Sequence, residues 1–146
     1  METIRELLQV FVRRFGLLNA SCTDNCCGEE VSLVQSHILH EITRQTEPSM
    51  LQVAEALGVD ITTFSRQIKT LVRKGLVTKT TDPEDRRIQL LSLTPEGQRV
   101  KKEIDLLMER YMEKIFSQMT EFEREMVLRS IKLLNEAILK SGSCCS

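Results

Sequence analysis

The stretch that decides the fold is SMLQVAEALGVDITTFSRQIKTLVRKGL, residues 49–76. It predicts two short helices joined by a tight turn. Ser49 and Gln52 are spaced as a capping box at the start of the first helix, and apolar residues then recur at helical spacing. Gly58 suits the left-handed conformation with which many helices end, and Asp60 suits the N-cap of the second helix. We therefore predict a helix-turn-helix.

The second predicted helix has two contrasting faces. Its apolar face comprises Ile61, Phe64, Ile68, Leu71 and Val72. Its other face comprises Thr62, Thr63, Arg66, Lys69, Thr70 and Arg73, with Ser65 and Gln67 at the margins. No carboxylate occurs from Ile61 to Thr81, so this face suits phosphates and base edges. The alternative interpretation is an amphipathic hairpin whose polar face is merely solvated.

The residues that follow favour DNA binding over a solvated hairpin. Val77–Thr81 and Ile88–Leu93 are typical of β-strands, and DPEDRR between them is typical of a turn with two arginines at its tip. A helix-turn-helix followed at once by a basic-tipped hairpin predicts a winged helix, whose second helix enters a major groove. The predicted fold class is mainly α with a small β-wing.

The chain resembles the MarR family of winged-helix transcription regulators. The resemblance rests on VAEALGVDITTFSRQIKTLVRKGLV (53–77), on the turn DPEDRR and on LSLTPEG (91–97), which keep the family's order without a gap. It implies a winged helix-turn-helix lobe that binds DNA and terminal helices that form a dimerisation layer. We expect a single unit over residues 1–146, with its parts divided as follows: the DNA-binding lobe at 31–93 and the dimerisation helices at 1–20 and 95–140.

The predicted flanking helices carry more apolar surface than a small winged helix needs. Their stripes comprise Ile4, Leu7, Leu8, Phe11, Phe15 and Leu18, then Val100, Ile104, Leu107, Tyr111 and Ile115, then Phe122, Met126, Leu133, Leu134 and Ala137. A further helix, at residues 32–44, is expected to turn Val34, Ile38 and Ile42 inward. The stripes can pack on one another within one chain or between two chains. Two-fold symmetry matches palindromic double-stranded DNA, so we predict a homodimer on a palindromic operator.

Charge is unevenly distributed along the chain. The net charge is −1, yet residues 62–89 hold seven basic and three acidic side chains, whereas residues 1–47 hold four basic and seven acidic ones. Positive charge is thus concentrated where DNA would lie. No apolar run approaches the length of a membrane span, and the N-terminus lacks the character of a signal peptide, so we expect a cytoplasmic protein with no membrane partner. No catalytic motif is present, which predicts that the chain is not an enzyme and requires no cofactor.

Individual DNA contacts follow from side-chain chemistry. Arg66 is the candidate base reader, because arginine bonds guanine bidentately. The hydroxyls of Thr62, Thr63 and Ser65 stand at the helix N-terminus, and Lys69 and Arg73 are candidates for phosphate contacts. In the turn, Asp85 is expected to pair with an arginine and hold the tip in shape. The resemblance suggests Arg87 as the paired residue and Arg86 as the minor-groove probe, a choice that the residues alone leave open.

The five cysteines lie only in polar stretches, at Cys22, Cys26, Cys27, Cys144 and Cys145. Incidental thiols are one interpretation. Because cysteine is usually buried, a site for a thiophilic metal or metalloid that releases DNA is the other, with His37 as a further candidate ligand suggested by the resemblance. We therefore predict a repressor released by an effector. A small aromatic or lipophilic ligand is the alternative effector, and a thiol enzyme or metal-trafficking protein is the alternative function.

Overall fold

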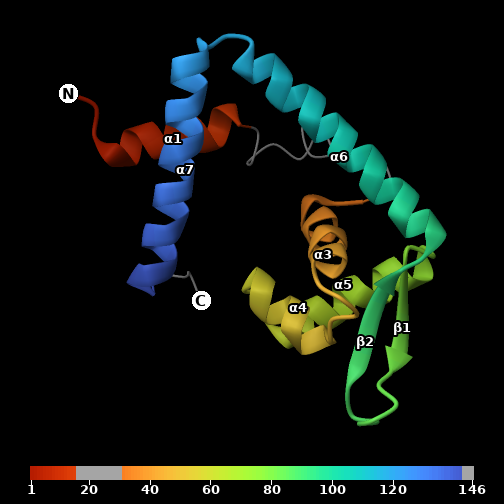
Figure 1. Cartoon of the computed structure of the whole chain (residues 1–146). Helices are drawn as coiled ribbons and strands as arrows, with labels where there is room; N and C mark the ends of the chain where they lie inside the picture. Colours follow the sequence, from red (N-terminus) through yellow and green to blue (C-terminus); the bar gives the residue numbers. More distant parts are fainter. Residues whose placement is uncertain (16–30, 143–146) are drawn as a thin grey trace. The chain divides into compact units, whose positions relative to one another are not determined.

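The computed structural model describes residues 1–15 and 31–142 and contains six helices and one antiparallel sheet within those ranges. In chain order the elements are α1 (Ile4–Arg14), α3 (Leu33–Arg44), α4 (Met50–Leu57), α5 (Ile61–Arg73), β1 (Val77–Thr81), β2 (Gln89–Leu93), α6 (Pro95–Phe116) and α7 (Glu121–Ser141) (Figure 1). The chain divides into two compact units, Met1–Leu107 and Met108–Ser146, which we describe separately. The predicted fold class, mainly α with a small β-wing, is confirmed.

The predicted helix-turn-helix is present with the expected caps. Ser49 caps α4 and forms a capping box with Gln52, and Gly58 ends that helix in the left-handed region with φ 65°. Asp60 caps α5 by accepting from the Thr63 N–H at 2.9 Å. These contacts span three residues or fewer, so they could be predicted from local spacing.

The core of the first unit lies beneath α3, α4, α5 and the sheet. Its largest members are Phe64, Ile68 and Leu71 of α5, which are buried together with Ile38 and Leu39 of α3. Side chains that recur every three to four residues on one face of each helix fill this core.

Three side chains that we expected to face inward are exposed. Val34 is 43% exposed, because Gln35 takes the inward position in the first turn of α3. Ile61 and Val72 are 49% and 40% exposed, because they flank the buried row of α5 and do not belong to it. The apolar face of α5 is therefore narrower than its sequence pattern indicates.

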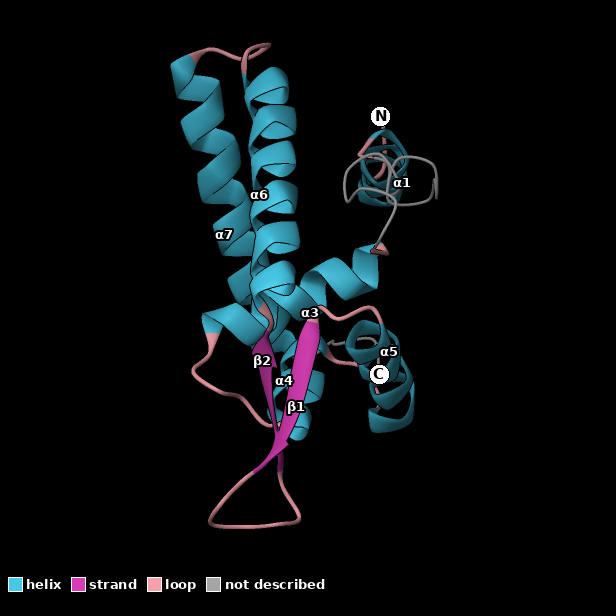
Figure 2. Cartoon of the chain, turned by 90° about the vertical axis from the view of Figure 1, so that its right-hand side faces the viewer, coloured by secondary structure: helices cyan, strands magenta, loops and turns pink. Residues whose placement is uncertain are grey.

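The wing is the hairpin of β1 and β2, which projects beyond α3, α4 and α5 in both views, as Figure 2 shows most clearly. Its register pairs Val77 with Leu93 and Thr81 with Gln89. The second strand begins one residue later than predicted, because Ile88 closes the turn: its N–H donates to the Asp85 carbonyl at 3.0 Å.

A close contact ties the start of α6 to the end of the helix-turn-helix. The Thr94 hydroxyl donates to the Gly75 carbonyl at 2.6 Å and accepts from the Gly97 N–H at 2.9 Å. A Cβ on Gly97 would lie only 2.0 Å from the Leu76 carbonyl oxygen. The sequence LTPEG therefore supplies a helix cap and a glycine that lets two backbones approach.

The helices near the two ends of the chain expose their apolar stripes. Neither α1 nor α7 contains a buried residue. In α7 the exposed fractions of Phe122, Leu133 and Leu134 are 72%, 62% and 53%. Leu18, which we assigned to the first stripe, lies outside the residues that the structure describes. Across residues 1–15 and 31–142, no helix is both long and apolar enough to cross a bilayer.

Candidate nucleic-acid interface

The outward face of α5 is polar, basic and accessible. The exposed members of the predicted set are Thr62, Thr63, Arg66, Lys69 and Arg73, while Ser65 is half-buried at the margin. The buried side chains of the same helix hold it against the core, so the polar row points away from the protein. None of the six α5 residues that we named as DNA contacts is therefore buried in the core.

The N-terminus of α5 is closed by its cap. Both the backbone and the side chain of Thr63 hydrogen-bond to the Asp60 carboxylate, and these bonds lower the pKa of Asp60 below its ordinary value. The Thr63 N–H is consequently already used within the protein. An incoming phosphate would meet the exposed side chain of Thr62 more readily than the amide of Thr63.

The tip of the wing is shaped by one ion pair. Asp85 accepts from the Arg87 backbone N–H at 3.0 Å and from its Nε at 3.1 Å, and the Arg87 guanidinium lowers the pKa of Asp85. The structure therefore contains the Asp85–Arg87 pair that the family resemblance suggested. The neighbouring Arg86 is exposed, and no salt bridge or side-chain hydrogen bond holds it within the part of the chain that is described.

Our sequence reasoning missed a buried glutamine that contacts α5. Gln35 is 7% exposed and its Nε2 donates to Gln67 Oε1 at 3.1 Å. The local signal was the capping box of Ser32 and Gln35 at the start of α3. That spacing indicates the helix start but gives no sign of a partner 32 residues away in the chain.

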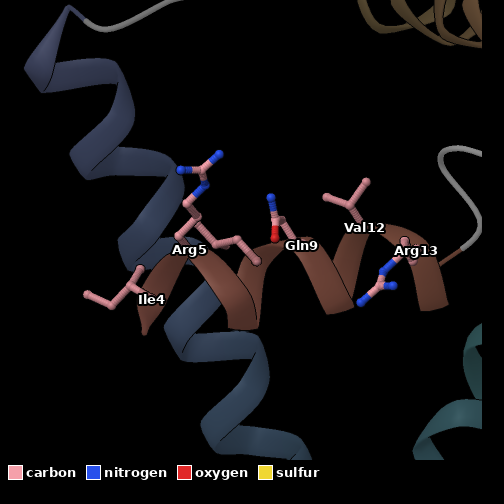
Figure 3. Close-up of a pocket in the computed structure, with 6 residues that line it drawn as sticks. Ile4, Arg5, Gln9, Val12 and Arg13 are labelled. Atoms are coloured by element: carbon pink, nitrogen blue, oxygen red, sulfur yellow. The ribbon is translucent and has the colours of Figure 1, made fainter. Parts of the chain in front are cut away.

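A pocket of about 770 Å³ lies along α1. It is lined by the apolar side chains of Ile4, Leu8 and Val12 together with Arg5, Gln9 and Arg13. Figure 3 shows Arg5, Gln9 and Val12 projecting from the same side of the helix. This pocket combines an apolar wall with two guanidinium groups.

Comparison with known proteins identifies the lobe that carries this interface. The model of the MarR family matches residues 31–89, which run from two residues before α3 to the first residue of β2. The chain carries a MarR family domain. Members of this family are transcription regulators and not enzymes, so the chain is a DNA-binding transcription regulator, and the alternative of a thiol enzyme is set aside.

Individual MarR proteins resemble the chain over almost its whole length. The uncharacterised HTH-type transcriptional regulator YxaD of Bacillus subtilis is 29% identical over 140 residues, covering 95% of each chain. The structure of Streptococcus pneumoniae FabT in complex with DNA is similar with a TM-score of 0.81 at 20% identity, covering 94% of this chain and 99% of FabT. Staphylococcus aureus MarR in complex with salicylate and kanamycin is similar with a TM-score of 0.79 at 17% identity, covering 93% of this chain and 92% of that one.

The candidate effector residues are divided by the boundary of the MarR domain. His37 lies inside it, exposed on α3. All five cysteines lie outside the described residues, so the structure does not test a thiol site. Within residues 1–15 and 31–142, no group of three or more His, Cys, Asp or Glu side chains is placed to hold a metal ion.

Proposed function

We propose that this MarR-type regulator binds a palindromic operator as a homodimer, with α5 in the major groove and the wing along the minor groove. The observation that carries the proposal is the exposed, carboxylate-free face of α5 beside a basic wing tip. FabT, which has the same fold, was solved in complex with DNA, and this supports the assignment. A regulator of this kind would act in the cytoplasm, and no membrane partner is proposed.

The proposed contacts divide into base reading and positioning. Arg66 reads a base edge, because its guanidinium is exposed on the outward face and can bond guanine O6 and N7 together. Lys69 and Arg73 contact phosphates. The remaining α5 contacts are hydroxyls at its N-terminal end: Thr62, Thr63 and Ser65.

In the wing, the two adjacent arginines have different roles. Arg87 is engaged by Asp85, which fixes the shape of the tip. Arg86 is left to enter the minor groove, where narrow A·T tracts attract guanidinium.

The homodimer is proposed from the uncovered apolar surface of α7. Side chains such as Leu133 and Leu134 are more than half exposed, and burying them between two chains would be favourable by about 25 cal/mol per Å² of apolar surface. A second copy of the same chain also supplies the second recognition helix that a palindrome requires.

In vitro selection from a library of random duplexes tests the operator. We expect the recovered sequences to converge on an inverted repeat whose half-sites lie about one helical turn apart. Recovery of sequences without two-fold symmetry would contradict a symmetric dimer on DNA.

The regulator is further proposed to be a repressor that an effector releases. One candidate effector is a thiophilic metal or metalloid bound by Cys22, Cys26 and Cys27, with Cys144, Cys145 or His37 as additional ligands. Arsenite, cadmium and zinc should then release operator DNA from the wild type but not from a variant with the first three cysteines changed to serine. An unchanged response in that variant would eliminate the thiol site.

The second candidate effector is a small aromatic or lipophilic acid. It is favoured by the α1 pocket, whose apolar wall and two arginines suit an aromatic carboxylate. The S. aureus MarR structure contains salicylate, which is of this class. Salicylate should then release the operator from the wild type, and Arg5→Ala should weaken that release without changing DNA affinity in its absence.

A further inference from the structure

A single buried amide links the first turn of α3 to the recognition helix α5. The Oε1 of Gln35 accepts from the Ser32 backbone N–H at 3.2 Å and from the Lys74 ammonium at 3.4 Å. Its Nε2 donates to Gln67 Oε1 at 3.1 Å. Two segments that are more than 30 residues apart in the chain, the start of α3 and the helix α5 with its C-cap Lys74, therefore meet at one side chain.

The partners of Gln35 determine which way its amide points. Ser32 N–H and the Lys74 ammonium are donors only, so they require the oxygen, and the NH₂ group remains for Gln67. Gln35 is 7% exposed, and a buried amide that loses its partners is costly. Rotation of α5 relative to α3 would break the bond to Gln67 and is therefore resisted.

We propose that Gln35 is a positioning residue for DNA recognition: it fixes the rotation of α5 about its own axis and so directs Arg66. This proposal rests on the proposed function, in which α5 reads the operator. Arg66 directly precedes Gln67, so any rotation that separates Gln67 from Gln35 also moves Arg66. A displaced bidentate contact loses base discrimination, whereas phosphate contacts that tolerate small shifts keep general DNA affinity.

A double-mutant cycle of Gln35→Met and Gln67→Met tests this role. The readout is a discrimination ratio: the dissociation constant for the selected operator with one half-site base pair changed, divided by the dissociation constant for the unchanged operator. Each single variant should lower this ratio about tenfold, and the double variant should lower it by about the same factor, because one shared bond is lost. Gln67→Met leaves the capping box of α3 intact, so it separates the link to α5 from the cap.

A conservative variant and a matched control accompany the cycle. Gln35→Glu should retain most of the ratio, because its carboxylate accepts from Ser32 and Lys74 and from the Gln67 amide once that amide has turned round. Gln52→Met is the control, since Gln52 completes the capping box of α4 in the same way at 2.8 Å but is exposed. It should leave the ratio unchanged.

Several outcomes would overturn the positioning role. Multiplying losses in the double variant, about a hundredfold, would show that Gln35 and Gln67 act independently. An unchanged ratio in Gln67→Met would overturn it as well. This variant is sufficient by itself if circular dichroism shows that Gln35→Met does not fold. Equal binding of both duplexes by the wild type would instead overturn the proposed function, and the positioning role with it.

Discussion

At the scale of single residues, the adjacent arginines Arg86 and Arg87 of the wing differ in whether another residue holds their side chains. Arg87 is tied to Asp85 through both its backbone and its guanidinium, whereas the neighbouring Arg86 projects unpaired among the described residues. On α5, the side chain of Arg66 is likewise exposed and forms no salt bridge among the described residues. The helix itself is held in place by the buried residues on its opposite face. An accessible guanidinium on a fixed backbone is well suited to reading a base.

Arg66→Ala should therefore reduce specificity more than it reduces general DNA binding. The expected loss is about 1–3 kcal/mol on the operator, with relaxed preference at one base position in each half-site. Fluorescence anisotropy with operators changed at each position measures both effects. An unaltered preference at every position would remove Arg66 from the base-reading face.

Glu41 should make stability depend on pH in the acid range. Its carboxylate accepts from Arg44 at 2.6 Å and from Gln45 at 3.0 Å, and these bonds lower its pKa in the folded state below the ordinary 4.5. The stabilisation is thus present above about pH 4.5 and is lost as the pH falls through the folded-state pKa.

Glu41→Gln should consequently flatten the decline of the unfolding midpoint below that pH, as measured by thermal denaturation. Glu55→Gln, which changes an exposed glutamate on α4, is the control and should follow the wild type. Parallel pH profiles for the wild type and Glu41→Gln would contradict the assignment.

At the scale of elements, local contacts could be predicted and long-range contacts could not. The caps at Ser49 and Asp60 depend on neighbours within three residues, so their spacing in the sequence was sufficient. The link of Gln35 to Gln67 and the approach of Gly97 to Leu76 depend on tertiary packing, and no periodicity reveals them. The exposure of Val34 was missed for the same reason, because only the packed fold shows that Gln35 points inward.

Gly97→Ala should destabilise the lobe, although alanine normally stabilises a helix relative to glycine. A methyl group at this position would overlap the Leu76 carbonyl oxygen, which belongs to backbone and cannot move aside as a side chain could. We expect a loss of about 1–3 kcal/mol in the free energy of unfolding. Denaturant unfolding measures it, with Gln98→Ala as the exposed neighbouring control. Equal or greater stability of Gly97→Ala would show that α6 does not approach Leu76 so closely.

At the scale of the whole molecule, the apolar surface left exposed by each unit indicates assembly. Large apolar side chains on α1 and α7, such as Phe11 and Leu134, are 52% and 53% exposed. Exposed apolar surface of this extent is typical of interaction sites. A two-fold dimer would cover it and would set two recognition helices for one operator.

Leu134→Glu should separate the dimer and weaken operator binding together. Placing a carboxylate in an apolar interface is unfavourable, and one chain alone would keep mainly nonspecific affinity for DNA. Sedimentation velocity should give twice the chain mass of 16.8 kDa for the wild type and the single mass for the variant. A monomeric wild type that still binds the palindrome tightly would contradict the dimer.

The most direct test of the DNA-binding face is the salt dependence of operator affinity for the wild type, Lys69→Ala and Lys114→Ala. Lys69 is exposed on α5, whereas Lys114 is exposed near the end of α6, outside the proposed interface. If two α5 helices contact DNA, Lys69→Ala should lower the slope of log affinity against log salt by about two, because each dimer loses two phosphate contacts. Lys114→Ala should leave the slope unchanged. An unchanged slope for Lys69→Ala would contradict the placement of α5 in the DNA groove.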